Sequence, residues 1–282
     1  MICIANPMRT AARARSWLTV LALSLTATLA RADEPIEMVN IPSGSFVMGS
    51  CQQDKKQAFL GESSCANPDP DASSDETPQH RVSVGAFQMG KTEVTLGQFK
   101  AYIKATGRSN LVDDDFIKYN AYGDDAPVVQ VSWHDAQGFI SWLNDTAGGG
   151  WRLPTEAAWE YACRAGSGSA RYCGGSDPNV VAWHDGNSGN RPHRVGTKKA
   201  NTYGLYDMSG NVEEWVEDCW HANYRGAPSD GSAWTSSCNG EGRGLRGGSW
   251  DNDARDSRAA NRDDDSPGDR NDDSGFRLAR TH

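Results

Sequence analysis

The chain has 282 residues, with 28 basic and 37 acidic side chains and a formal net charge of −9. This sign excludes nucleic acid as the expected partner, because nucleic-acid binding needs clustered positive charge. Thirty glycines and ten tryptophans favour a compact, turn-rich fold over a helical bundle.

The N-terminus has the pattern of an export signal. Three arginines precede an apolar run at 17–29, which is followed by the small-residue sequence Ala-Arg-Ala. The run is too short to span a membrane. We therefore expect a Sec-type signal peptide at 1–32, with cleavage near Ala32 and a periplasmic or secreted product. The mature chain, 33–282, would have no transmembrane segment, and loss of four arginines would bring its net charge to −13.

Alternating apolar residues predict short strands after the signal. The stretch at 36–50, IEMVNIPSGSFVMGS, predicts a strand pair around a Ser-Gly turn, and 81–95 alternates in the same way. The intervening stretch at 51–79 is polar and contains three prolines, which predicts a loop.

Three amphipathic helices are predicted in the middle of the chain. The first begins after Thr95 and ends at Gly107, the second begins after Ser132, and the third begins after Thr155. Beyond Gly166 no stretch of useful length has helical periodicity, so loops and short strands should follow. We expect a single α+β domain.

The cysteines predict a disulfide framework. Six remain after signal cleavage, an even number that suits an oxidising compartment. A catalytic or metal-binding cysteine is the alternative. The favoured bridges join local pairs: Cys51–Cys65, Cys163–Cys173 and Cys219–Cys238.

The segment 246–277 is rich in short acids and in arginine. It contains nine aspartates, three asparagines and six arginines. The arginines could clamp an anionic ligand, or they could pair with the neighbouring aspartates and supply hydrogen bonds that a loop-built core otherwise lacks. We favour the scaffold. Runs of acids such as 113–115 and 263–265 could bind metal, but such runs are usually solvated surface.

Four stretches in order resemble the formylglycine-generating enzyme, or sulfatase-modifying factor, family: WRLPTEAAWEYACRAG, YGLYDMSGNVEEW, LRGGSW and GFRLAR. The resemblance covers essentially the whole mature chain. It implies a single irregular, loop-rich α+β domain related to the C-type lectin fold. The founding activity of the family is oxidation of a sulfatase cysteine to formylglycine with copper and oxygen.

The copper chemistry of the family depends on two thiolates, because soft Cu(I) is held by soft sulfur ligands. In the copper enzymes the first cysteine lies three residues after the serine of RGGS and the second five residues further on. These positions are Asn252 and Ser257 here, counted from Ser249. Neither side chain is a competent Cu(I) ligand. We therefore expect neither copper nor copper oxidase activity.

The resemblance also implies a calcium site on the segment DMSGNVEE. Its ligands would be the Asp207 side chain, the carbonyls of Gly210 and Val212, and the Glu214 carboxylate. Ca²⁺ prefers hard oxygens, often from a tight loop. The alternative is a turn in which Asp207 caps backbone amides. We favour calcium, although Glu213 stands where the motif commonly has tryptophan.

The favoured function is binding of a polar ligand or an envelope protein through the C-terminal face, without copper chemistry. The Asp/Asn-rich pattern also resembles the tails of variable proteins diversified by retroelements, which share this fold. The candidate contact residues are Ser249, Trp250, Asn252, Asp253, Arg255, Asp256, Ser257, Asp264 and Arg270.

Two other functions remain open at the level of the sequence. The first is a periplasmic oxidoreductase or maturation enzyme, similar to the family member that matures the siderophore pyoverdine. In that case the carboxyls of Asp253 and Asp256 would serve as acid and base. The second is an accessory subunit of an envelope complex.

Overall fold

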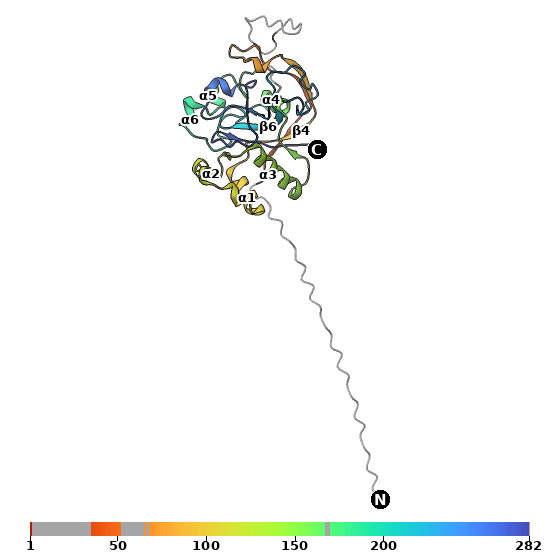
Figure 1. The fold of residues 1–282 in the computed structure, drawn as a ribbon, viewed down its shortest axis with the longest axis vertical. Coiled ribbons are helices and arrows are strands. Elements are labelled where there is room, and N and C mark those ends of the chain that lie inside the picture. Colours follow the sequence, from red (N-terminus) through yellow and green to blue (C-terminus); the bar gives the residue numbers. More distant parts are fainter. Residues whose placement is uncertain (2–34, 52–64, 66–67, 167–169, 282) are drawn as a thin grey trace.

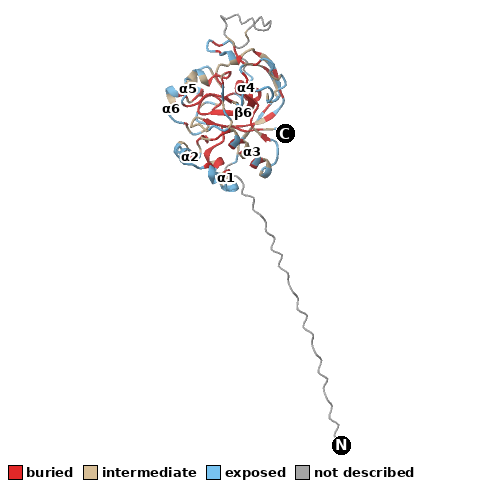
Figure 2. Ribbon diagram, in the orientation of Figure 1, coloured by how far each residue is buried: buried red, intermediate tan, exposed pale blue. Residues whose placement is uncertain are grey.

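The computed structural model describes residues 1, 35–51, 65, 68–166 and 170–281. They form a layered α+β domain, with buried residues concentrated in its interior (Figures 1 and 2). The predicted signal peptide and its cleavage near Ala32 lie outside the described residues. Within them, no helix has the length and apolar character needed to cross a membrane.

Two four-stranded sheets and one strand pair carry the fold. The first sheet is antiparallel throughout and has the order β1 (Met38–Ile41), β4 (Phe87–Gly90), β10 (Ala279–Arg280), β5 (Trp151–Arg152). The separate pair is antiparallel and consists of β2 (Gly44–Met48) and β3 (His80–Val84).

The second four-stranded sheet is built from the last third of the chain. Its strands β6 and β9 run parallel and its other pairs are antiparallel. The strand order is β8 (Arg262–Asp265), β7 (Arg243–Arg246), β6 (Glu213–Cys219), β9 (Ser274–Gly275).

The predicted pairing of the two strands in 36–50 is wrong. Both strands exist, but β1 pairs with β4 and β2 pairs with β3. Only Pro42 and Ser43 separate β1 from β2. Each strand finds its full antiparallel partner in the next strand pair along the chain, so this short connection crosses between two sheets.

The three predicted helices are confirmed, together with their caps. The Thr95, Ser132 and Thr155 hydroxyls each accept a hydrogen bond from the backbone amide three residues later, at 3.0–3.2 Å. Helices α2, α5 and α6 have only four to six residues, too few for a periodic signal. The six helices of the described residues are α1 (Leu96–Thr106), α2 (Asp114–Tyr119), α3 (Trp133–Thr146), α4 (Glu156–Arg164), α5 (Pro178–Val181) and α6 (Asp185–Ser188).

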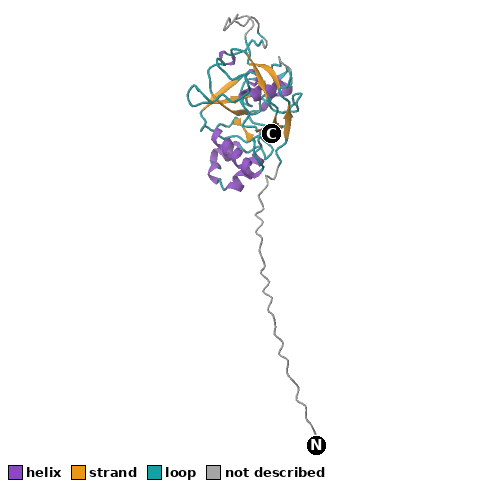
Figure 3. Ribbon diagram, turned by 90° about the vertical axis from the view of Figure 1, so that its right-hand side faces the viewer, coloured by secondary structure: helices purple, strands orange, loops and turns teal. Residues whose placement is uncertain are grey.

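Aromatic packing joins the helical end of the domain to the C-terminal strands. Helices α1, α2 and α3 group at one end of the body (Figures 1 and 3). The rings of Phe99 and Phe139 stack at 5.8 Å, and both meet the edge of Phe276. All three side chains are fully buried. The end of the chain is thus part of the core and not a loose acidic tail.

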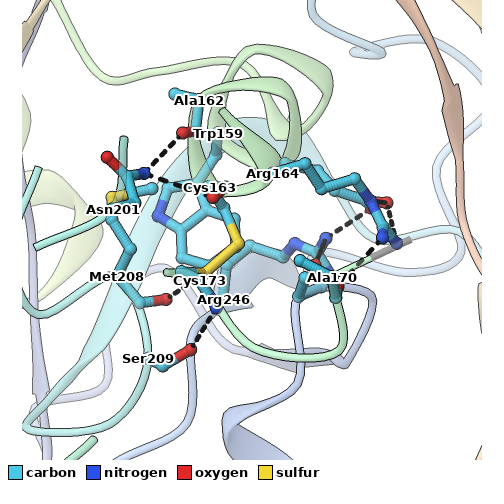
Figure 4. Close-up of a disulfide and its surroundings, with 12 residues drawn as sticks. Trp159, Ala162, Cys163, Arg164, Ala170, Cys173, Asn201, Met208, Ser209 and Arg246 are labelled. Atoms are coloured by element: carbon cyan, nitrogen blue, oxygen red, sulfur yellow. Dashed lines mark hydrogen bonds and ion pairs between the residues drawn. A yellow bond between two sulfur atoms is a disulfide. The ribbon is translucent and has the colours of Figure 1, made fainter. Parts of the chain in front are cut away.

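The three predicted disulfides are confirmed: Cys51–Cys65, Cys163–Cys173 and Cys219–Cys238. Figure 4 shows the buried Cys163–Cys173 bridge at the end of α4, beside Trp159 and Arg246. The side-chain amide of Asn201 donates to the Ala162 and Cys163 carbonyls at this helix end, at 2.8 and 3.2 Å. The bridge therefore ties the C-terminus of α4 to the following loop.

Four arginines of the segment 246–277 are buried, and each meets a buried glutamate at 2.5–2.7 Å. These arginines are at most 5% exposed. The pairs are Arg246–Glu160, Arg258–Glu76, Arg262–Glu156 and Arg277–Glu214.

The scaffold expected of the arginines is present, but its partners differ from the expectation. Only Arg255 pairs with a neighbouring aspartate, Asp253. The strand register explains the difference. Arg246 and Arg262 lie opposite each other on β7 and β8, and strand alternation directs them inward while Asp263 points to the other face. The carboxylates available inside are the distant glutamates.

Removing one partner from a buried pair should be costly. We expect Arg258→Met to lower the free energy of unfolding by about 3–5 kcal/mol, because the Glu76 carboxylate would remain buried without its cation. Arg255→Met, in the same segment but exposed, should cost less than about 1 kcal/mol. Urea unfolding with the disulfides intact measures both, and equal losses would contradict the scaffold.

A buried acid on β6 predicts a pH dependence of stability. Asp218 accepts hydrogen bonds from the Glu156 and Trp234 amides, both at 2.8 Å. Burial, followed by repulsion from Glu156, raises its pKa to about 7. The folded-state pKa is therefore above the unfolded value of about 3.9. Its contribution to stability is full below that value and is lost as the pH rises through about 7.

We expect the stability of the wild type relative to Asp218→Asn to fall as the pH rises from about 4 to about 7. The lost acceptor in Asn adds an offset that does not vary with pH. Urea unfolding at several pH values measures the difference, with the exposed Asp145→Asn as control. Parallel curves for the wild type and Asp218→Asn would contradict the prediction.

Candidate functional site

A tight turn after β7 positions the candidate site. Gly247 and Gly248 have φ values of 102° and 66°, a region that favours glycine. A Cβ atom on Gly248 would lie 2.7 Å from the Asp256 carbonyl oxygen. Two glycines thus let the backbone at Ser249 approach the backbone at 256–257, and the turn brings together residues that the sequence separates.

Ser249 is the hub of a short hydrogen-bond network. Its hydroxyl donates to Asn252 Oδ1 at 2.8 Å, and its backbone amide donates to the same oxygen at 2.7 Å. The hydroxyl also lies 3.3 Å from Asp273 Oδ2. Ser249 is fully buried. Asn252, where the resemblance predicts the family's first cysteine, therefore caps the turn with its amide oxygen.

Trp250 contributes packing more than surface. It is 9% exposed and packs with Val129 and Val212. Its indole nitrogen donates to the Asp272 carbonyl at 3.1 Å. The side chain therefore packs beneath the turn in the interior, and its small exposed surface offers a ligand little contact area.

Ser257, where the resemblance predicts the family's second cysteine, is also buried. Its carbonyl accepts a hydrogen bond from the Ser209 hydroxyl at 2.7 Å. Its own hydroxyl has no hydrogen-bond partner among the described residues. At the two positions predicted for the family's cysteines, Asn252 therefore supplies an amide and Ser257 a hydroxyl. Both are hard donors, which do not fit Cu(I).

The other predicted contact residues lie nearer the surface. Asp256 and Arg270 are half-buried, and Asp253, Arg255 and Asp264 are exposed. Arg270 donates to both oxygens of Asp135 on α3, at 2.8 and 3.1 Å. That guanidinium is already used to anchor the chain, so the exposed side of the predicted face consists mainly of acids.

Glu213 is a site residue that the sequence reasoning missed. It lies on β6, is 6% exposed, and its carboxyl has no hydrogen-bond or ion-pair partner in the described part of the chain. Burial, followed by repulsion from Asp263 and Asp273, raises its pKa well above the ordinary value. An acid in place of the motif's tryptophan, within the buried strand EEWV, was the available signal.

The predicted calcium segment holds one free oxygen and one occupied carboxylate. Asp207 is buried, and its Oδ2 accepts a hydrogen bond from the Gly196 amide at 2.6 Å, while its Oδ1 has no partner in the described residues. Glu214 receives Arg277 on both oxygens, each at 2.6 Å, and the Trp159 indole at 2.7 Å. Asp207 is therefore the more open of the two predicted side-chain ligands.

Glu93 is a second residue that the sequence reasoning missed. It is 1% exposed and its Oε1 accepts a hydrogen bond from Asn211 at 2.9 Å, but its Oε2 has no described partner. Burial first, and then the Asp207 charge, raises the pKa of Glu93, and burial raises that of Asp207 to about 6. Two adjacent carboxyls with unused oxygens need a proton or a hard cation between them. The donor set fits Ca²⁺.

Acidic side chains alone do not form a metal site in the described residues. Among the described residues, no three His, Cys, Asp or Glu side chains converge closely enough to hold a metal ion. The calcium ligand set implied by the family uses two backbone carbonyls in addition to side chains.

Known proteins similar to this chain share its domain. Residues 25–282 match the family model described as the sulfatase-modifying factor enzyme 1-like domain. The formylglycine-generating enzyme of Streptomyces coelicolor is 30% identical over 308 residues, covering 86% of this chain and 88% of the enzyme. The solved structure of PvdO from Pseudomonas aeruginosa is 35% identical with a TM-score of 0.72, covering 87% of this chain and 94% of that chain.

A third relative is much longer than the region that it shares. The serine/threonine-protein kinase pkn1 of Chlamydia caviae is 31% identical over 268 residues, which cover 86% of this chain and 38% of the kinase. The chain thus spans well under half the length of that relative.

The turn at Gly248 should be sensitive to substitution. We expect Gly248→Ala to lower the free energy of unfolding by about 1–3 kcal/mol, because the backbone is left-handed there and the new methyl group meets the Asp256 carbonyl. Gly268→Ala, where a Cβ atom meets nothing within 4 Å, is the matched control and should be near neutral. Thermal unfolding measures both; a tolerated Gly248→Ala would show that the turn does not need glycine.

Proposed function

Because this chain belongs to the sulfatase-modifying factor family, we propose that it is an exported member that binds a polar ligand through the face around residues 249–257 and does not use copper. The Gly247–Gly248 turn brings Ser249 close to residues 256–257, where the resemblance predicts the family's reactive positions. At these positions Asn252 and Ser257 offer oxygen and nitrogen atoms instead of sulfur, and such atoms can hydrogen-bond to a polar ligand.

One observation carries the proposal. The six cysteines of the described residues all form disulfides. Asn252 and Ser257 stand where the resemblance predicts the family's two copper-binding cysteines. Two thiolates are needed to hold Cu(I), and within the described residues no free thiol can take their place. This donor set supports a function in binding over the founding oxidation.

The copper prediction can be measured directly. The oxidised protein should leave Cu(I) with a competing chelator and should leave a cysteine-containing sulfatase peptide unconverted by mass spectrometry. The formylglycine-generating enzyme of Streptomyces coelicolor serves as the positive control. One equivalent of bound copper together with an aldehyde product would refute the proposal.

We further propose that calcium binds at Asp207. The unused oxygens of Asp207 and Glu93, with the Gly210 and Val212 carbonyls implied by the family, would hold the ion, and the Glu214 side chain would remain with Arg277. A bound Ca²⁺ offsets the repulsion between the two buried carboxyls.

Calcium binding should be visible in stability. We expect a chelator to lower the unfolding temperature of the wild type, because an ion bound only to the folded state stabilises it by mass action, by about 2.7 kcal/mol at a hundredfold excess over Kd. Asp207→Asn should reduce the chelator effect, and the exposed Asp230→Asn should keep it. An unchanged melting curve on chelation, with no calcium by elemental analysis, would disprove the site.

A second candidate function is favoured by the likeness to PvdO, which extends over most of both chains. In that case the protein would be a maturation enzyme, and Asp256 would be the better placed carboxyl. Burial raises the pKa of Asp256, whereas Asp253 is exposed and held by Arg255. Conversion of a pyoverdine precursor by the wild type, lost in Asp256→Asn and kept in Asp145→Asn, would favour catalysis over binding alone.

A further inference from the structure

Glu213 breaks a rule that the other buried glutamates obey. Six glutamates are buried in the described residues, and four of them face an arginine at 2.5–2.7 Å. Glu93 has a hydrogen bond from Asn211. Glu213 has neither an arginine nor a hydrogen-bond donor within the described part. A buried carboxylate without a partner is costly, so this side chain is suited to a partner that comes from outside.

Strand geometry separates Glu213 from the arginines. Side chains alternate between the two faces of a strand, so Glu214 turns toward Arg277 and Glu213 turns to the opposite face. The register Trp215↔Leu245↔Asp263 places Asp263 on the same face as Glu213. Arg246 and Arg262 therefore point away from the Glu213 carboxyl. Arg243 lies on the face of Leu245 and Asp263, but its guanidinium lies over the Trp133 ring and donates to the Glu217 carbonyl.

The charges of four aspartates act on the Glu213 carboxyl. They include exposed and half-buried side chains, so the group extends from the buried carboxyl to solvent. None of the four has an ion-pair partner among the described residues. We define the acidic cluster as Glu213 together with the aspartates whose charges act on it, Asp256, Asp263, Asp265 and Asp273.

The spacing of the acidic cluster favours an organic cation over a bare metal ion. In the described residues no three acids converge on one point, whereas an ion such as Ca²⁺ needs six to eight close oxygens. A guanidinium group spreads five N–H donors over a plane and can serve several separated carboxylates at once. It is also the group that the protein itself places against four of its five other buried glutamates.

We propose that the acidic cluster receives the guanidinium group of a ligand, with Glu213 as its buried acceptor. The inference rests on the proposed binding function and gives the charge of the ligand. The cation would make at Glu213 the kind of contact that Arg277 makes at Glu214. The surrounding aspartates would attract it from solvent and contact its remaining donors.

The test compares two probes that differ in charge and hardly in shape: Nα-acetyl-arginine amide and its neutral isostere Nα-acetyl-citrulline amide. Binding is measured by calorimetry on the full oxidised protein at low salt. We expect the arginine probe to bind at least tenfold more tightly than the citrulline probe, with a loss of affinity in high salt.

Substitution assigns the contact to its residue. Glu213→Gln keeps the shape of the side chain and removes the buried group that can ionise, so it should fold, as thermal unfolding will verify. We expect it to weaken binding of the arginine probe on the order of tenfold or more. The exposed Asp145→Asn carries the same change of charge outside the acidic cluster and should bind like the wild type.

Several outcomes would overturn the inference. They are no binding of the arginine probe up to millimolar concentrations, unchanged binding in Glu213→Gln, and calcium binding that depends on Glu213 and is not displaced by the probe. Equal binding of the arginine and citrulline probes at this face would agree with the proposed binding function but would show that the ligand need not carry a positive charge. Copper and aldehyde formation are measured separately, so failure of the proposed function remains distinguishable.

Discussion

Four buried arginine–glutamate pairs determine where the C-terminal segment lies. The segment has little regular structure, and its arginines also donate to backbone carbonyls of other loops. Arg262 reaches the Asp75 and His221 carbonyls, and Arg277 reaches the Gly90 and Tyr206 carbonyls. These donors replace ladder hydrogen bonds that a loop-built core lacks. Because an unpaired buried charge is costly, each glutamate fixes the place of its arginine and of the loop that carries it.

The same sheet that carries this scaffold also carries the acidic cluster. Alternation along β6 and β8 sends Glu214 and Arg262 to the paired face and Glu213 and Asp263 to the other. The paired face holds the arginine–glutamate pairs, and the other face carries three acids, Glu213, Asp263 and Asp265, with one arginine, Arg243. The domain therefore holds its fold with one set of carboxylates and keeps a second set available for a partner.

Membership in the sulfatase-modifying factor family establishes the fold of this chain. It does not establish a reaction, because function depends on the residues of the site and not on the fold. The turn at Gly247–Gly248 brings the backbone at Ser249 close to the backbone at Asp256. Ser249 donates to the Asn252 side chain, the Ser257 carbonyl accepts from the Ser209 hydroxyl, and the Ser257 hydroxyl has no partner among the described residues.

The sequence by itself determined the features whose causes lie within a few residues. The helix caps at Thr95, Ser132 and Thr155 and the three short-range disulfides are of this kind, and all are confirmed. The motifs in order also indicated the family and the fold. These signals are local, so they can be read from the sequence without knowledge of the packing.

Only the tertiary structure decided which distant groups meet. It paired β1 with β4 instead of β2, matched Arg258 with Glu76, and left Glu213 without a cation. Such contacts join residues far apart in the chain, and the charges alone allow many pairings. The choice among them depends on which side chains the folded strands turn inward together, where an unpaired charge is penalised most.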